Sequence, residues 1–159
     1  MSQPSHDPEL VTLEPQRVAV LRETVRMDAL PDFFARAYQA VMEAAGNQGA
    51  RIIGPPVGIY YSMPTDSVDV AAGFPVDRPV SGDGLRTETL PGGPAAQVMH
   101  VGSYDTMQAT YGRLMVWLQE QGLVPTTTMW ESYLTEPNAD APETMLTQIT
   151  WPVVAPGGE

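Results

Sequence analysis

An internal repeat constrains the fold of this chain more than any other feature. Positions 73 residues apart carry the same residue type in an ordered series, which runs through Tyr38 and Tyr111, Met42 and Met115, Gly49 and Gly122, Tyr60 and Tyr133, and Pro64 and Pro137. Two further matches occur at slightly longer offsets, 74–76 with 151–153 and 18–21 with 96–99. An ordered series of this kind indicates that one supersecondary unit has been duplicated.

Each half has the pattern of a strand, a helix and two further strands. In the first half we expect strands at 17–23, 57–62 and 67–74, and in the second half at 95–101, 127–135 and 144–151. The helices are predicted from apolar residues at helical spacing. The first stripe is Phe34, Tyr38, Val41, Met42 and Ala45, ended by Gly46 or Gly49, and the second is Tyr104, Met107, Tyr111, Leu114, Met115 and Leu118, ended by Gly122.

The predicted fold class is α+β. Two strand–helix–strand–strand units, placed side by side, form one concave antiparallel sheet with two helices on one face. We expect a single domain over 10–154, built from repeats 10–76 and 86–154 with a linker at 77–85. The ends, 1–9 and 155–159, are expected to be flexible. A ligand cleft is expected where the two repeats meet.

The composition excludes several classes of function. Nineteen acidic residues against eight basic ones give a net charge of −11, and no basic residue is lysine, so we expect no direct binding of nucleic acid. The absence of cysteine excludes disulfides and thiolate metal sites, and His6 and His100 lie far apart, so we expect no metal and no other cofactor. No apolar run reaches the length of a membrane span and the N-terminus is polar, which predicts a cytoplasmic protein without membrane contact.

The predicted strand around Trp130 carries the densest cluster of candidate site residues. Side chains alternate between the two faces of a strand, so Glu131 and Tyr133 share one face while Trp130 points to the other. The repeat places Gly58 at the position of Glu131 and Tyr60 at the position of Tyr133. A carboxylate walled by tyrosine rings, with a glycine that leaves room, suits a flat organic cation. The alternative is a glutamate at a sheet edge that points into solvent.

Four further residues are candidate walls of a ligand site. Tyr104 and Tyr111 lie seven residues apart on one helix face, and Met107 and Phe34 offer adaptable apolar surface. Such stripes are more often part of an ordinary helix core than walls of a ligand site.

Several of these segments resemble the GyrI-like small-molecule-binding domain, which also forms the effector-binding part of some AraC-type and MerR-type transcription regulators. The segments are Val101-Gly102-Ser103-Tyr104-Asp105, Gly122-Leu123, Trp130-Glu131-Ser132-Tyr133-Leu134-Thr135-Glu136-Pro137, and Gly54-Pro55-Pro56 followed by Tyr60. The resemblance covers roughly 10–154 and implies a concave antiparallel sheet, two helices and a ligand pocket between the repeats.

In the family's regulators a buried glutamate among aromatic side chains meets hydrophobic cations, and the resemblance puts Glu131 at that position. Tyr133 and Tyr60 match the tyrosine positions. Those regulators also carry a helix-turn-helix domain, for which this chain has no room and no basic helix, so a stand-alone form is expected. Whether a DNA-binding or gyrase partner exists is left open.

Two functions from different classes remain. The first is a multidrug-type binding protein for amphipathic, cationic aromatic ligands, with Glu131 supplying the charge. The alternative, implied by stand-alone relatives of the family, is a cyclopropanoid hydrolase that detoxifies strained-ring DNA-alkylating compounds. In that reading Glu131 deprotonates a water and Tyr133 hydrogen-bonds the developing phenolate of the substrate. A protein-binding module like the family's gyrase-inhibiting members is a more distant alternative.

Overall fold

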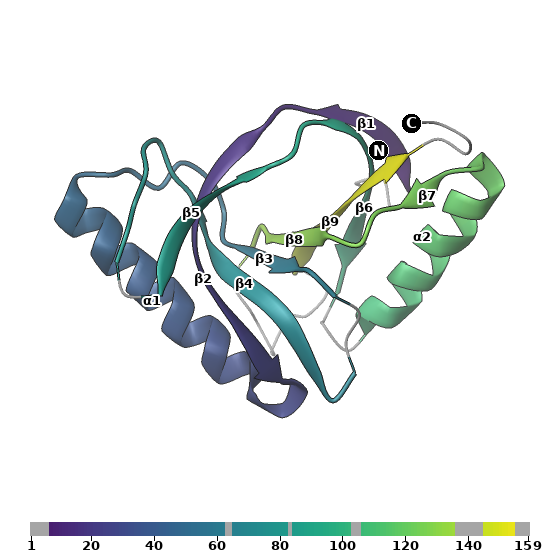
Figure 1. Ribbon diagram of the computed structural model, residues 1–159. Coiled ribbons are helices and arrows are strands. Elements are labelled where there is room, and N and C mark those ends of the chain that lie inside the picture. Colours follow the sequence, from purple (N-terminus) through teal and green to yellow (C-terminus); the bar gives the residue numbers. More distant parts are fainter. Residues whose placement is uncertain (1–6, 63–64, 83, 103–105, 136–144, 155–159) are drawn as a thin grey trace. The chain divides into compact units, whose positions relative to one another are not determined.

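The chain folds into two compact units, each with one long helix and one antiparallel sheet (Figure 1). The computed structural model describes residues 7–62, 65–82, 84–102, 106–135 and 145–154. We call Glu14–Gly92 the first unit, and Met1–Leu13 together with Gly93–Glu159 the second unit. The predicted α+β class and the duplicated strand–helix–strand–strand order are confirmed. Neither helix of the described residues is long and apolar enough to cross a membrane.

The first unit has the sheet order β3-β4-β2-β5, with every neighbouring pair antiparallel. Its elements are β2 (Gln16–Arg26), the 3-10 turn η1 (Met27–Ala29), α1 (Leu30–Gln48), β3 (Val57–Tyr60), β4 (Ser67–Pro75) and β5 (Leu85–Leu90). The second unit has the order β1-β6-β9-β8, and β7 also pairs with β9. Its elements are β1 (Glu9–Leu13), β6 (Gly93–Val101), α2 (Met107–Gln121), β7 (Val124–Pro125), β8 (Met129–Tyr133) and β9 (Leu146–Val154).

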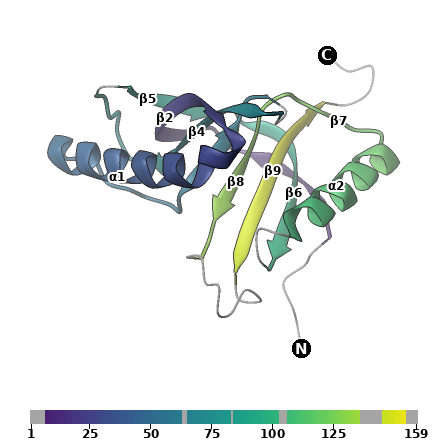
Figure 2. The same cartoon turned by 90° about the horizontal axis from the view of Figure 1, so that it is seen from below.

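Each helix buries one face against the sheet of its own unit (Figure 2). Helix α1 buries Phe33, Ala37, Val41 and Ala45, and α2 buries Thr110, Leu114 and Leu118. The predicted stripes were therefore partly wrong, since Met42 is 49% exposed and Met115 is 37% exposed. In each helix the buried residues are four positions apart and therefore lie on one face. In α1 two of them are alanines, which let the helix backbone approach the sheet closely.

The backbone repeats the duplication in detail. Both helices end at a glycine in the left-handed conformation, Gly49 with φ 73° and Gly122 with φ 69°, where a side chain would be strained. Beyond each glycine the next N–H bonds back to an equivalent carbonyl, that of Ala45 in α1 and that of Leu118 in α2. The offset of 73 residues therefore holds for the helices and their caps.

The long strands repeat at an offset of 77 residues rather than 73. Ala19 of β2 pairs with Phe74 of β4, and Ala96 of β6 pairs with Trp151 of β9. Ala19 thus corresponds to Ala96, and the sequence match of 18–21 with 96–99 was displaced by one residue. In a strand such a displacement exchanges the two faces, so only the observed pairing identifies equivalent side chains.

Each repeat also begins with a strand that the sequence pattern did not reveal. Leading strand β1 comes before β2 in the chain but pairs with β6, and leading strand β5 comes before β6 but pairs with β2. The registers are equivalent, since Leu13 lies opposite Gly93 and Leu90 lies opposite Gln16. Both leading strands are short edge strands with exposed polar positions, so they lack the apolar alternation that marks a strand in sequence.

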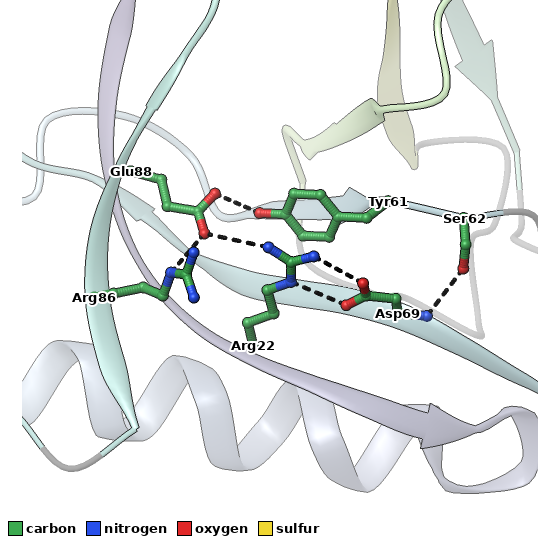
Figure 3. Close-up of polar contacts among 6 residues, drawn as sticks. All are labelled: Arg22, Tyr61, Ser62, Asp69, Arg86 and Glu88. Carbon is green, nitrogen blue, oxygen red and sulfur yellow. Dashed lines mark hydrogen bonds and ion pairs between the residues drawn. The ribbon is translucent and has the colours of Figure 1, made fainter.

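A network of charged side chains fastens β5 to the rest of the first unit (Figure 3). Arg22 of β2 binds both carboxylate oxygens of Asp69 in β4, at 3.0 and 2.7 Å, and its guanidinium lies 3.7 Å from the centre of the Tyr61 ring. The Tyr61 hydroxyl donates to Glu88 of β5 at 2.5 Å, and Arg86 Nε lies 2.8 Å from the second Glu88 oxygen. Burial raises the pKa of Tyr61, so its hydroxyl remains a donor. Arg22 therefore holds three strands through one side chain.

We predict that Arg22→Met destabilises the protein. The change keeps the aliphatic stem but leaves Asp69 and Glu88 without this cation, and we expect the free energy of unfolding to fall by about 1–3 kcal/mol. Arg26→Met on the same strand is the matched control, because Arg26 and its partner Asp28 are 79% and 71% exposed. That control should change stability by less than about 0.5 kcal/mol. Urea unfolding measures both, and equal losses would contradict the assigned role of the network.

Candidate functional site

The candidate site lies on the face of the second unit's sheet that α2 covers. Glu131 in β8 is directly opposite Ile149 in β9, and two residues along β8 Tyr133 is opposite Thr147. Thr147 is in turn opposite His100 in β6. Residues that are directly opposite share a face of the sheet, so Glu131, Tyr133 and His100 all point toward α2.

The Glu131 carboxylate is buried and receives two phenol hydroxyls. The side chain is only 7% exposed, so the alternative in which it points into solvent does not hold. Tyr133 donates to Oε1 at 2.7 Å, and Tyr111 of α2 donates to Oε2. Burial raises the pKa of Glu131, and this rise is opposed by the two tyrosine donors and by the positive charge of His100. The site thus holds a carboxylate in surroundings that disfavour its charge.

His100 is the second buried titratable group of the site. It is 3% exposed, and both ring nitrogens meet threonine hydroxyls of the α2 segment, Nδ1 at 2.6 Å from Thr110 Oγ1 and Nε2 at 3.2 Å from Thr106 Oγ1. Arg113 also donates to the Thr110 hydroxyl, at 3.3 Å. The sequence pattern indicates His100 only as a candidate metal ligand and does not place it in the site. A signal was available, because Thr106 and Thr110 stand at helical spacing on a face that is otherwise apolar.

The first unit provides an internal comparison for this polar site. On the helix, Phe33 stands at the position of Thr106 and Ala37 at the position of Thr110. On the strands, Val70 stands at the position of Thr147, Glu23 at that of His100, and Gly58 at that of Glu131. Three of these counterparts, Phe33, Ala37 and Val70, belong to one buried apolar cluster. The fold therefore does not require polar groups between helix and sheet. The polar groups of the second unit satisfy one another by hydrogen bonds, and they are the feature in which it differs most from the first unit.

The remaining predicted site residues of the second unit are not all near Glu131. Trp130 lies on the opposite face of β8, as strand alternation predicts, where it is buried opposite Thr150. Met107 is the first residue of α2 and is half-buried. Tyr104 lies outside the described residues. Of the predicted set, the structure thus brings Glu131, Tyr133 and Tyr111 together.

Three predicted site residues belong to the first unit. Phe34 and Tyr60 are half-buried and border the apolar cluster between α1 and its sheet. Gly58 is buried in β3 opposite Ala72. Tyr38, the counterpart of Tyr111, finds no carboxylate at Gly58 and instead donates to the Val57 carbonyl at 3.2 Å. The participation of Phe34, Tyr60 and Gly58 in ligand binding remains a prediction.

A surface groove of about 620 Å³ runs along the exposed side of α2, away from the candidate site. Its lining includes Ala109, Gly112, Val116 and Trp117, and also Arg113, which donates to Thr110, but not Glu131 or the two tyrosines that bind it. The buried face of α2 lies between the groove and the sheet. We therefore locate the candidate site by its chemistry and not by this groove.

The arrangement can pair charge or transfer a proton. Among the described residues no group of three or more histidine, aspartate or glutamate side chains could hold a metal ion. What remains is one buried carboxylate, one buried imidazole and a set of hydroxyl donors. A carboxylate that is partly desolvated attracts a cation more strongly than one in water, and a raised pKa makes it a better proton acceptor.

Solved structures of several proteins share this fold. The C-terminal domain of EcmrR matches with a TM-score of 0.81 and 19% identity, covering 94% of this chain and 98% of that one. SAV2435, in a structure bound to tetraphenylphosphonium, matches with a TM-score of 0.68 and 17% identity, covering 93% and 94%. A hydrolase from Listeria innocua matches with a TM-score of 0.65 and 16% identity, covering 96% and 94%. At these identities the likeness establishes the fold.

Family membership follows from the sequence as a whole. No curated protein matches the chain. The model of the GyrI-like small molecule binding domain matches residues 6–154, which is nearly the whole length and includes every element described above. As the sequence resemblance predicted, the chain belongs to the GyrI-like family of small-molecule-binding domains.

Proposed function

We propose that this protein binds lipophilic organic cations and that the Glu131 carboxylate pairs with their positive charge. The observation that supports this most directly is the burial of the Glu131 carboxylate, which is 7% exposed and held by the hydroxyls of Tyr111 and Tyr133. The equivalent position in the first unit is a glycine, so the same strand pairing forms there without a carboxylate.

Cations are selected because they gain one interaction that neutral ligands lack. A hydrophobic ligand, whether neutral or cationic, gains free energy from leaving water and from contact with the tyrosine rings. Only a cation also gains from the carboxylate, and that gain is large because the site is partly desolvated. A positive charge near the ring faces of Tyr111 and Tyr133 adds cation–π attraction.

Two further observations agree with this proposal. The net charge of −11 favours the approach of cations and disfavours nucleic acid as a direct partner. SAV2435, which shares the fold, has been solved with the lipophilic cation tetraphenylphosphonium. We therefore choose tetraphenylphosphonium as the probe, and triphenylphosphine oxide as a neutral molecule that keeps three of its four rings.

We predict that Glu131→Gln weakens the binding of tetraphenylphosphonium by roughly 30- to 150-fold. The change keeps the shape of the side chain and removes its charge, which is worth about 2–3 kcal/mol in a charge-assisted contact. The affinity for triphenylphosphine oxide should change by less than about threefold, since a neutral ligand does not use the charge. Isothermal titration calorimetry of both ligands with both proteins measures the ratio.

Glu120→Gln is the matched control for this experiment. Glu120 is exposed near the end of α2, so the control changes the net charge by the same amount away from the site. It should leave both affinities unchanged. If Glu131→Gln weakened the neutral ligand and the cation equally, Glu131 would support the fold rather than read charge.

Burying the Glu131 carboxylate also lowers the stability of the folded protein, and the pH dependence of this cost can be predicted. The pKa of Glu131 in the folded protein is raised above its ordinary value of 4.5, so the folded state holds this proton more tightly than the unfolded state. Its contribution to stability is therefore most favourable below pH 4.5 and is lost as the pH rises through the folded pKa.

We predict that the gain in thermal unfolding temperature from Glu131→Gln is larger at pH 8 than near pH 4.5, because the cost of burying the ionised carboxylate appears as the pH rises through the folded pKa. The gain should shrink as the pH falls toward 4.5, because the wild-type side chain is then neutral as well. Calorimetric melts of both proteins across this range test the sign. A gain that stayed constant with pH would show that the charge of Glu131 is not what costs stability.

A ring-opening hydrolase is the second candidate, and the raised pKa of Glu131 supports it, because a carboxylate with a higher pKa is a stronger base. Glu131 would take a proton from water while the water oxygen bonds to the strained ring carbon. The electron pair of the broken carbon–carbon bond would move to a substrate oxygen, and the Tyr133 hydroxyl would turn from Glu131 Oε1 to donate its hydrogen bond to that oxygen instead.

A product assay with a cyclopropane-containing alkylator tests this candidate. If the protein is a hydrolase, liquid chromatography detects the ring-opened product above the buffer rate, and Glu131→Gln lowers turnover by at least about 100-fold because glutamine cannot accept the water proton. Turnover equal to buffer for the wild-type protein, together with tight binding of the intact alkylator, would eliminate the hydrolase and retain the binding function.

A further inference from the structure

We propose that one face of α2 is the contact surface of a homodimer, in which it packs antiparallel against the same face of a second copy of the chain. This inference goes beyond the proposed cation binding and does not depend on it, because it rests on residues other than Glu131 and the two tyrosines that bind Glu131. We call this surface the groove face. It consists of the α2 residues that line the surface groove, namely Ala109, Gly112, Arg113, Val116, Trp117 and Glu120.

The groove face is largely apolar although it lies at the surface. Val116 is 55% exposed, Ala109 and Gly112 are also exposed, and Trp117 is half-buried. Residues three and four positions apart on a helix are neighbours, so Ala109, Gly112 and Val116 form one continuous strip. Covering this strip and the tryptophan beside it would remove apolar surface from water, and tryptophan is enriched where proteins contact one another.

The equivalent face of α1 is polar. The offset of 73 residues that holds for the helices places Arg36, Gln39 and Glu43 at the positions of Ala109, Gly112 and Val116. These polar side chains bind partners within the first unit, since Arg36 donates to Glu23 at 3.0 Å and Gln39 donates to Glu43 at 3.3 Å. The fold thus accepts polar side chains at these positions. The apolar set on α2 is typical of a helix face that another molecule covers.

The packing of the second unit does not require a glycine at Gly112. A Cβ atom added there would meet no atom of the described residues within 4 Å beyond its own helix, and its backbone is that of an ordinary helical residue. Glycine in an exposed helix is less favourable than alanine or glutamine, because it loses more backbone freedom on folding. A glycine does allow a second helix to come close at this point, which agrees with a helix–helix contact.

The charges of the groove face favour a second copy as the partner and fix its direction. Arg113 and Glu120 are seven residues apart, which is two helical turns, so they lie on the same face. In an antiparallel pair whose two-fold axis passes between Val116 and Trp117, Arg113 of each copy lies opposite Glu120 of the other, and Val116 lies opposite Trp117. A parallel pair in the same register would place like charges opposite each other. The groove face is therefore complementary to itself.

The contacts within one copy are compatible with this pairing. Arg113 donates to Thr110, and an arginine has five N–H donors, so a contact to a second copy does not require it to leave Thr110. Asp7 is the other charged residue that lines the groove. It belongs to the segment before β1 and not to the helix, so it takes no part in the register of the two helices.

The first test is the oligomeric state of the wild-type protein at about 0.15 M salt, where charges more than about 8 Å apart are largely screened and the net charge of −11 opposes association less. One helix pair is a small interface, so we expect a dissociation constant of about 10–100 μM. Sedimentation velocity between about 5 and 500 μM should then show the transition from monomer to dimer. A monomer over the whole range would overturn the proposal.

Charge reversal tests the register. Arg113→Glu and Glu120→Arg should each weaken self-association by at least about tenfold, because each places like charges opposite each other. An equimolar mixture of the two variants should associate within about threefold of the wild-type protein, since both contacts again join a carboxylate to a guanidinium. A variant that is merely misfolded cannot be restored by mixing. If the mixture remains monomeric while the wild-type protein dimerises, the proposal is overturned.

Two further variants install the residues that α1 carries. Val116→Glu and Gly112→Gln should each weaken association by at least about tenfold, by burying a charge and by blocking the close approach of the helices. Gly112→Gln should also raise the midpoint of urea unfolding, because glutamine is the better helix former. A loss of association together with a gain in stability cannot come from damage to the fold. Wild-type association of Val116→Glu would show that another surface joins the copies, and would overturn the proposal.

Glu43→Arg and Arg26→Glu are the matched controls for the charge reversals. They change the net charge by the same amounts as Glu120→Arg and Arg113→Glu, but in the first unit, where Glu43 is exposed and the side chain of Arg26 is 79% exposed. Both should retain wild-type association. If they weakened it as much as the variants of the groove face, net charge and not the contact would govern association, and the proposal would fail.

Discussion

A negative charge that is removed from water has to be met by donors or by a positive charge, and this constraint organises the second unit. Glu131 meets it with the hydroxyls of Tyr133 and Tyr111, one from its own strand and one from the helix above. The helix that supplies Tyr111 is in turn fastened to the sheet through Thr110 and His100. The position of α2 and the chemistry of the carboxylate are therefore set by the same few contacts.

The duplication allows fold and function to be separated within one molecule. Both repeats share strand pairing, helix caps and register, yet one fills the space between helix and sheet with the apolar side chains of Phe33, Ala37 and Val70. The other places hydroxyls, an imidazole and a carboxylate there, beside Leu114 and Leu118 of α2. Apolar packing between helix and sheet is therefore sufficient for the first unit to fold. Folding alone does not explain the polar groups of the second unit, whereas ligand binding, the property of the small-molecule-binding family, does.

Local patterns in the sequence predicted what depends on local physics, and missed what depends on tertiary contact. Strand alternation was enough to place Glu131 and Tyr133 on one face with Trp130 on the other, because the period of a strand is fixed by its backbone. The role of His100 could not be predicted this way, since its partners Thr106 and Thr110 reach it only when α2 packs on β6. Pairing register was likewise beyond reach, and β1 and β5 were overlooked because short edge strands are weakly patterned.

The exchange of the two leading strands has an evolutionary consequence. If each repeat descends from a separate chain, β1 and β5 are the strands that two such chains would have traded in a symmetric dimer. Identical subunits must carry every residue twice, so such a dimer has either two buried carboxylates or none. Joining the copies in one chain removes that restriction. With glycine at 58 and glutamate at 131, the chain has one buried carboxylate at these positions for each pair of repeats, a ratio that identical subunits cannot have.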